Sequence, residues 1–130
     1  TGKVRLFKSH KSDYGDGEQK RDFLYVKDAV DMTLFFYDNL ETSGIYNLGA
    51  GVARSWNDLA KAVFAAMGKK PNIEYIDMPD SIRNQYQYFT EADITKLREV
   101  GYDKQITSLE ESVSDYVQNY LEKGAYLGGQ

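Results

Sequence analysis

An α/β fold is predicted by three observations on this sequence of 130 residues. Short apolar runs that suit strands alternate with longer segments whose apolar residues recur at helical spacing. The composition, with 42% hydrophobic and 28% charged residues, is typical of one globular domain. The sequence also lacks internal repeats and low-complexity tracts. Strands that alternate with helices along the chain indicate an α/β arrangement.

Four strands are expected, because branched and aromatic side chains, which pack well on a pleated surface, are concentrated in four short runs. These runs cover residues 4–7, 22–26, 44–48 and 73–76. The segment 8–20 is polar and contains glycine, which predicts a surface loop. Gly49-Ala50-Gly51 is either a tight turn toward a helix or a phosphate-binding turn. We favour the tight turn, because Arg54 stands where the dinucleotide fingerprint has its third glycine.

Four helices are expected from apolar residues at helical spacing, the first of them over residues 28–40. A Ser or Thr three residues before an acidic residue resembles a capping box, and this pattern predicts where the other three begin. The expected caps are Ser55, Thr90 and Thr107. Gly68 and Gly101 are expected to end the second and third helices.

Composition and charge exclude several classes of function. The net charge of −4 argues against nucleic-acid binding, which depends on clustered Lys and Arg. No apolar run approaches the roughly 20 residues that span a bilayer, so no membrane partner is expected. The chain contains no cysteine, which excludes disulfides, thiolate metal sites and a cysteine nucleophile.

Considered alone, the residues predict a binding surface without catalytic groups. His10 is the only histidine, and the acids at positions 13, 16 and 18 lack the spacing of a calcium loop, so no metal is expected. No Ser-His-Asp triad or closely spaced carboxylate pair stands out. Residues 83–88 (RNQYQY) form either an exposed loop or a lid whose amides and phenols hydrogen-bond a sugar or nucleotide.

Several segments together resemble the C-terminal part of the ADP-L-glycero-D-manno-heptose 6-epimerase family, which belongs to the extended short-chain dehydrogenases/reductases. RDFLYVKDA (21–29) followed by YNLG (46–49) is similar to a pattern shared across NAD-dependent sugar-nucleotide epimerases and dehydratases, with Ala29 where valine is common. FKSH (7–10) and the segment 83–102 are similar to motifs of the heptose epimerases alone. The resemblance covers nearly the whole chain.

The resemblance implies that residues 1–130 are the C-terminal sugar-nucleotide-binding part of a longer enzyme. The family's dinucleotide fingerprint and its catalytic Tyr-x-x-x-Lys pair lie in an N-terminal Rossmann part, and neither motif occurs in this chain. No catalytic or cofactor-binding residue is therefore expected here. Residues 28–48 are expected to pack on that missing part. The implied cofactor is NADP, bound by the N-terminal part of the intact enzyme.

The family's substrate contacts imply which residues of this chain bind a sugar nucleotide. Arg21 is expected against the pyrophosphate, where its planar fork can pair two anionic oxygens. The other implied substrate-binding residues are Phe7, Lys8, Ser9, His10 and Tyr86. The implied activity of the whole enzyme is interconversion of ADP-D-glycero-D-manno-heptose and ADP-L-glycero-D-manno-heptose, by oxidation and reduction at C6. The product would serve lipopolysaccharide core assembly, which implies a cytoplasmic enzyme.

Two other functions remain open. The chain is alternatively part of another extended short-chain epimerase or dehydratase, acting on a UDP- or GDP-sugar, although FKSH would then not be expected. A non-catalytic sugar-nucleotide-binding module is the second alternative. If residues 28–48 normally pack on the missing Rossmann part, the chain alone should expose an apolar patch, and we expect a homo-oligomer. The residues expected in the patch are Phe35, Phe36, Tyr37, Ile45, Tyr46 and Leu48.

Overall fold

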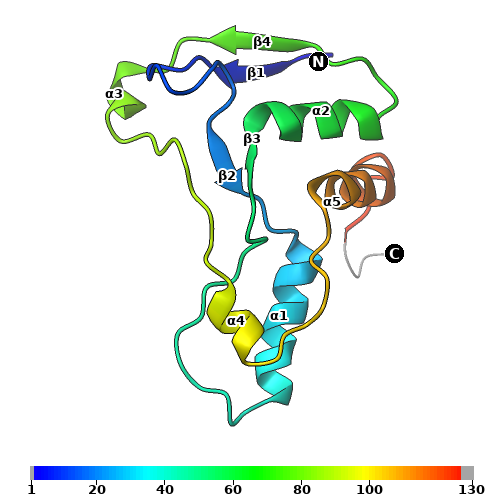
Figure 1. The fold of residues 1–130 in the computed structure, drawn as a ribbon. Helices are drawn as coiled ribbons and strands as arrows, with labels where there is room; N and C mark the ends of the chain where they lie inside the picture. The colour runs from blue at the N-terminus through cyan, green and yellow to red at the C-terminus, as the bar shows by residue number, and fades with distance from the viewer. Residues whose placement is uncertain (1, 127–130) are drawn as a thin grey trace.

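The computed structural model describes residues 2–126, which adopt the predicted α/β architecture (Figure 1). Most elements are short, and irregular segments connect them. In chain order they are β1 (Val4–Phe7), β2 (Lys20–Asp22), α1 (Val26–Asp38), β3 (Ala53–Ser55), α2 (Trp56–Ala66), β4 (Ile73–Ile76), α3 (Asp80–Arg83), α4 (Thr95–Glu99), α5 (Leu109–Tyr116) and a π-helical turn, η1 (Val117–Leu121).

The strands form two sheets of two strands each. β1 pairs with β4 in parallel, with Val4 opposite Ile73 and Phe7 opposite Ile76. β2 pairs with β3 in an antiparallel ladder. Helix α2 lies between the β1–β4 sheet and α5, whereas α1 and α4 form the opposite end of an elongated molecule (Figure 1). No helix within residues 2–126 combines the length and apolarity needed to cross a bilayer.

The end formed by α1 and α4 has its own apolar core. Met32, Leu97 and Tyr102 are at most 2% exposed, and Phe35 and Phe36 pack against them. Phe35, Phe36 and Tyr46, which were expected in an exposed patch, are only partly exposed, because Phe35 and Phe36 pack on this core and Tyr46 packs on Phe36. Tyr37, Ile45 and Leu48 are exposed, as predicted.

Two predicted strands differ from the structure. The strand expected over 22–26 lies instead at Lys20–Asp22, because pairing with β3 ends at Asp22 and α1 already begins at Val26. Residues 44–48 form no strand, because within residues 2–126 no strand lies beside them to complete a ladder. The short elements β3 and α3 were not predicted.

The capping prediction is confirmed for α2. The Ser55 hydroxyl accepts a hydrogen bond from the Asp58 backbone N–H at 3.0 Å, and the Asp58 carboxylate accepts from the Ser55 N–H at 3.1 Å. Gly68, with φ of +64°, follows the helix in the left-handed region that favours glycine, as expected.

The caps predicted at Thr90 and Thr107 are wrong, because both residues bind other partners. The Thr90 backbone N–H donates to the carbonyl of Lys20, and α4 begins only at Thr95. Thr107 donates from its N–H and its hydroxyl to the carboxylate of Asp28 in α1. The next residue, Ser108, caps α5 in its place.

Candidate functional site

The candidate site lies where β1 and β4 end. Because these strands are parallel and end opposite each other at Phe7 and Ile76, the segments that follow them leave from the same edge. In open α/β sheets, ligands bind beyond the carboxyl ends of the strands. The segments that leave this edge contain residues 7–10 and 83–88, which are the two segments that the sequence singled out.

Four aromatic rings join these two segments, and we call them the aromatic cluster: Phe7, Tyr14, Tyr86 and Tyr88. The rings of Phe7 and Tyr86 meet edge to face, with centroids 6.0 Å apart. Tyr88 is 6% exposed and lies 5.7 Å from Tyr86 and 5.3 Å from Tyr14. Residues 86 and 88 are therefore packed in place, and the segment is not a fully exposed loop.

Arg21 lies against the aromatic cluster. Its guanidinium carbon is 5.2 Å from the centroid of the Tyr86 ring, at cation–π distance. One guanidinium N–H donates to the carbonyl of Lys20 at 2.8 Å, and another donates to the carbonyl of Gln87. Backbone carbonyls and a ring face therefore orient the guanidinium, and its remaining N–H donors can bind an anion.

In the part of the chain that the structure describes, the charge of Arg21 is not balanced by an ion pair. Arg21 and Arg54 are direct cross-strand partners in the β2–β3 ladder, and like charges at such positions repel. Arg54 forms ion pairs with two carboxylates, whereas no ion pair within residues 2–126 includes Arg21. A shallow pocket of about 360 Å³ is lined by Arg21, Ile82, Gln85, Tyr86 and Gln87. An anionic group bound there would balance the charge.

The other predicted substrate-binding residues, Lys8, Ser9 and His10, follow β1, and each has a different hydrogen-bond or ion-pair partner. The Lys8 ammonium is 3.1 Å from the carboxylate of Asp77, across the ends of β1 and β4. The Ser9 hydroxyl exchanges hydrogen bonds with the backbone of Lys11, so it stabilises a turn. The backbone N–H of His10 donates to the Tyr88 hydroxyl at 2.9 Å, and its side chain is exposed. The structure thus brings Phe7, Arg21 and Tyr86 into contact, but not the side chains of Lys8, Ser9 and His10.

Tyr88 belongs to the segment 83–88 that the sequence singled out, but it was not among the predicted substrate-binding residues. It contacts both segments, through its ring and through its hydroxyl. The alternation in Gln85-Tyr86-Gln87-Tyr88 was the available signal, because side chains two residues apart in extended backbone lie on the same face.

The Gly49-Ala50-Gly51 segment is a tight turn, as favoured from the sequence. Its backbone N–H groups at Ala50 and Gly51 donate to the carboxylate of Asp22 at 2.6 and 3.0 Å. A side chain at Gly49 would lie 2.4 Å from Ala92, so only glycine fits. The N–H groups that a phosphate would need are bound to a carboxylate of the same chain.

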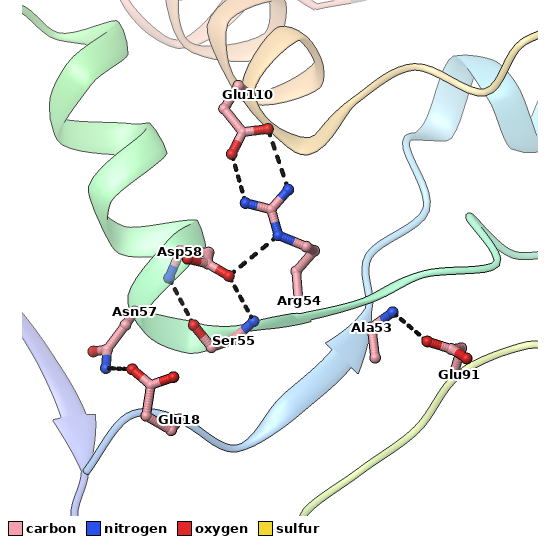
Figure 2. Close-up of polar contacts among 8 residues, drawn as sticks. All are labelled: Glu18, Ala53, Arg54, Ser55, Asn57, Asp58, Glu91 and Glu110. Carbon is pink, nitrogen blue, oxygen red and sulfur yellow. Dashed lines mark hydrogen bonds and ion pairs between the residues drawn. The ribbon is translucent and has the colours of Figure 1, made fainter. Parts of the chain in front are cut away.

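Figure 2 shows the polar contacts that fix β3 and α2 to α5. Two N–H groups of Arg54 bind the Glu110 carboxylate at 2.6 and 3.3 Å, and a third binds Asp58 at 3.2 Å. Arg54 lowers the pKa of the Glu110 carboxyl. Burial raises the pKa of Asp58, but the Ser55 N–H and Arg54 outweigh burial, so this pKa lies below its ordinary value. These contacts are structural and lie apart from the aromatic cluster.

The largest pKa shifts also lie away from the candidate site. Lys27, and then the Tyr25 hydroxyl, lower the pKa of Asp115, which ties α5 to the start of α1. Burial, together with this carboxylate, raises the pKa of Tyr25 to about 12. Within residues 2–126, no group of three or more potential metal ligands comes together. The site is thus suited to binding by rings, amides and one cation.

Comparison with known proteins confirms the resemblance found in the sequence. Residues 5–49 match the NAD dependent epimerase/dehydratase family. The chain is 53% identical over 128 residues to the ADP-L-glycero-D-manno-heptose-6-epimerase of Fusobacterium nucleatum, covering 94% of this chain and 39% of that protein. It is 51% identical over 120 residues to the enzyme of the same name from Nitratidesulfovibrio vulgaris, covering 92% and 37%. The chain therefore spans less than half the length of these relatives.

Solved structures support the fold. The chain is similar to the ADP-L-glycero-D-manno-heptose-6-epimerase of Helicobacter pylori, with a TM-score of 0.67 and 27% identity over 90% of this chain and 32% of that one. It is also similar to the Thermus thermophilus UDP-glucose 4-epimerase, with a TM-score of 0.74 and 23% identity over 95% and 36%. At 23% identity, the similarity to the UDP-glucose 4-epimerase concerns the fold alone.

Proposed function

We propose that this chain is the sugar-nucleotide-binding part of an ADP-L-glycero-D-manno-heptose 6-epimerase. The observation that carries the proposal is the position of Arg21. Its guanidinium lies over the ring of Tyr86, beside a pocket at the carboxyl ends of β1 and β4, and no ion pair among residues 2–126 includes it. The identity of 53% to a heptose epimerase over almost the whole chain supports this choice of substrate.

The residues of the chain would bind and orient the substrate. The planar guanidinium of Arg21 can pair two oxygens of a pyrophosphate, and its backbone contacts set the direction of this fork. Tyr86 supports the guanidinium from one face, and Phe7 packs against the edge of that ring. Lys8, Ser9 and His10, on the neighbouring segment, would contact the rest of the ADP-heptose.

The residues of this chain do not fit a dinucleotide. The one glycine turn that resembles a phosphate-binding turn already binds Asp22, and the fingerprint glycines are absent from the sequence. We therefore assign the NADP, and with it the oxidation and reduction at C6, to a part of the protein outside these 130 residues. The catalytic residues are assigned to that part as well.

Residues 28–48 would pack on that part. Val30, Leu34 and Tyr37 lie along one exposed face of α1, at 53%, 51% and 72% exposure. Ile45 is 89% exposed in the segment that forms no strand here. An exposed apolar helix face and an exposed apolar residue in a segment that forms no strand are features that an adjoining sheet would cover.

The test is an assay of the longer protein that contains this chain. It should convert ADP-D-glycero-D-manno-heptose to its L-glycero epimer. Arg21→Ala should weaken ADP-heptose binding by about 2 to 3 kcal/mol, roughly 30- to 150-fold in dissociation constant, and leave NADP retention unchanged. Arg21→Lys should restore part of the affinity, because a point charge cannot form the fork. Unchanged affinity in both variants would contradict the role of Arg21.

The isolated 130-residue chain is the control for this assay, and we expect it to show no turnover and to retain no NADP. Conversion of a UDP- or GDP-sugar instead of ADP-heptose would indicate another epimerase or dehydratase of the same superfamily. Sugar-nucleotide binding without turnover by the longer protein would indicate a non-catalytic module.

A further inference from the structure

A buried side-chain amide donates hydrogen bonds to the backbone where the chain leaves β1. Gln19 is 1% exposed, and its side-chain amide nitrogen lies 3.4 Å from the Phe7 carbonyl and 3.3 Å from the Lys8 carbonyl. The Gly17 backbone N–H also donates to the Phe7 carbonyl, at 3.2 Å. Buried polar groups need hydrogen-bond partners, so this amide has few alternatives to its present position.

Gln19 is itself fixed by the start of α2. Its backbone carbonyl accepts from the Trp56 N–H at 3.2 Å. Asn57, the next residue, donates from its backbone N–H to the Gly17 carbonyl at 3.0 Å and from its side chain to the Asp16 carbonyl at 2.9 Å. A side chain at position 17 would lie 2.3 Å from the Asn57 side-chain oxygen, so the loop approaches α2 as closely as glycine permits.

We propose that Gln19 is a positioning residue for substrate binding, acting through the backbone of Phe7 and Lys8. This inference rests on the proposed function, in which residues 7–10 contact ADP-heptose. Gln19 is 1% exposed and lines neither the pocket beside Tyr14 nor the pocket beside Arg21, so we assign it no direct contact with the substrate. Its two hydrogen bonds hold the carbonyls where the chain leaves β1, and they thereby set the path of the substrate-contacting segment.

The test uses Gln19→Met in the longer protein, since methionine has similar volume but no N–H donor. We expect the KM for ADP-heptose to rise about tenfold, with a much smaller change in kcat. Gln118→Met is the matched control. The side-chain amide of Gln118 donates to the Ala66 carbonyl at 3.1 Å, in a contact between η1 and α2, and its loss should leave KM unchanged.

Gln19→Glu provides a second, independent test of the role of Gln19 if the methionine variant folds poorly. Its carboxylate would face two carbonyl oxygens, whereas the protonated acid can donate one hydrogen bond. Burial and these acceptors favour the protonated form. The ratio of the variant's KM to the wild-type KM should therefore fall as the pH decreases from about 8 to about 6.

The outcomes separate the two proposals. Conversion of ADP-heptose by the wild type, with unchanged KM in Gln19→Met, would overturn the role of Gln19 and leave the proposed function standing. The same holds for a ratio in Gln19→Glu that does not change with pH. Absence of ADP-heptose conversion by the wild type would overturn the proposed function, and the role of Gln19 with it.

Discussion

Arg21 and Asp22 are neighbours in the sequence, yet they contribute to different parts of the molecule. Successive side chains of a strand point to opposite faces, so β2 directs Arg21 to Tyr86 and Asp22 to the turn at 49–51. The charge of Asp22 is satisfied by three backbone N–H groups, at Ala50, Gly51 and Ala92. Asp22 thus stabilises the fold, whereas the charge of Arg21 remains available to an anion.

Tyr102 allows a prediction about stability in alkaline solution. It is 2% exposed, its hydroxyl donates to the Asp31 carboxylate at 3.0 Å, and burial followed by this carboxylate raises its pKa to about 12. In the unfolded chain the Tyr102 hydroxyl loses its proton near pH 10. The stabilisation that the raised pKa gives to the folded state is therefore complete below about pH 10. The free energy of unfolding should therefore fall as the pH rises from about 10 to about 12.

Urea denaturation across this pH range tests the role of Tyr102. Tyr102→Phe should reduce the fall in the free energy of unfolding, because it removes the group that titrates. Some fall should persist, because the pKa of Tyr25 is raised in the same way. Tyr37→Phe is the control, since Tyr37 is 72% exposed. An equal fall in wild type and Tyr102→Phe would contradict the assignment.

At the scale of elements, β1 and β4 lie at the predicted residues and all four predicted helices form, whereas the other two predicted strands do not form where they were expected. α1 and α2 have apolar residues at helical spacing over several turns, and this local signal predicted both. β2 and β3 have three residues each and exist because they pair across the fold. Such pairing leaves little trace in a single sequence.

The start of α5 illustrates the limit of local patterns. Thr107 with Glu110 and Ser108 with Glu111 both match the capping pattern, and only the tertiary contact of Thr107 with Asp28 distinguishes them. The candidate site shows the same division. Phe7, Arg21 and Tyr86 were identified through motifs, whereas the buried contacts of Gln19 and Tyr88 depend on the folded chain.

The two capping boxes allow a matched comparison. Ser55 is 3% exposed, whereas Ser108 is exposed to water, which can replace a lost cap. Ser55→Ala should lower the free energy of unfolding by about 1 to 2 kcal/mol, and Ser108→Ala by about 0.5 kcal/mol. Urea denaturation of both variants gives the two values. A larger loss in Ser108→Ala would show that burial does not set the strength of these caps.

At the scale of the whole molecule, the two ends differ in how well they are covered. The end that holds the candidate site has α2 packed between the β1–β4 sheet and α5 (Figure 1). At the other end, α4 covers one side of α1. The other side presents four residues at helical spacing, which we call the α1 stripe: Val26, Val30, Leu34 and Tyr37, each more than half exposed.

The α1 stripe predicts how the isolated chain behaves in solution. Monomers seldom expose large contiguous apolar patches, so we expect copies of this chain to associate through the stripe. Leu34 lies within it and is 51% exposed, so Leu34→Glu should place a charge in the contact and keep the chain monomeric. Phe89→Glu is the control, because Phe89 is 52% exposed but lies outside α1. Light scattering over a concentration series should show a mass that rises for wild type and Phe89→Glu and stays constant for Leu34→Glu. A constant monomer mass for the wild type, up to high micromolar concentration, would mean that copies of the chain do not dock through the α1 stripe. The stripe would then no longer support the packing of residues 28–48 on a further part of the protein.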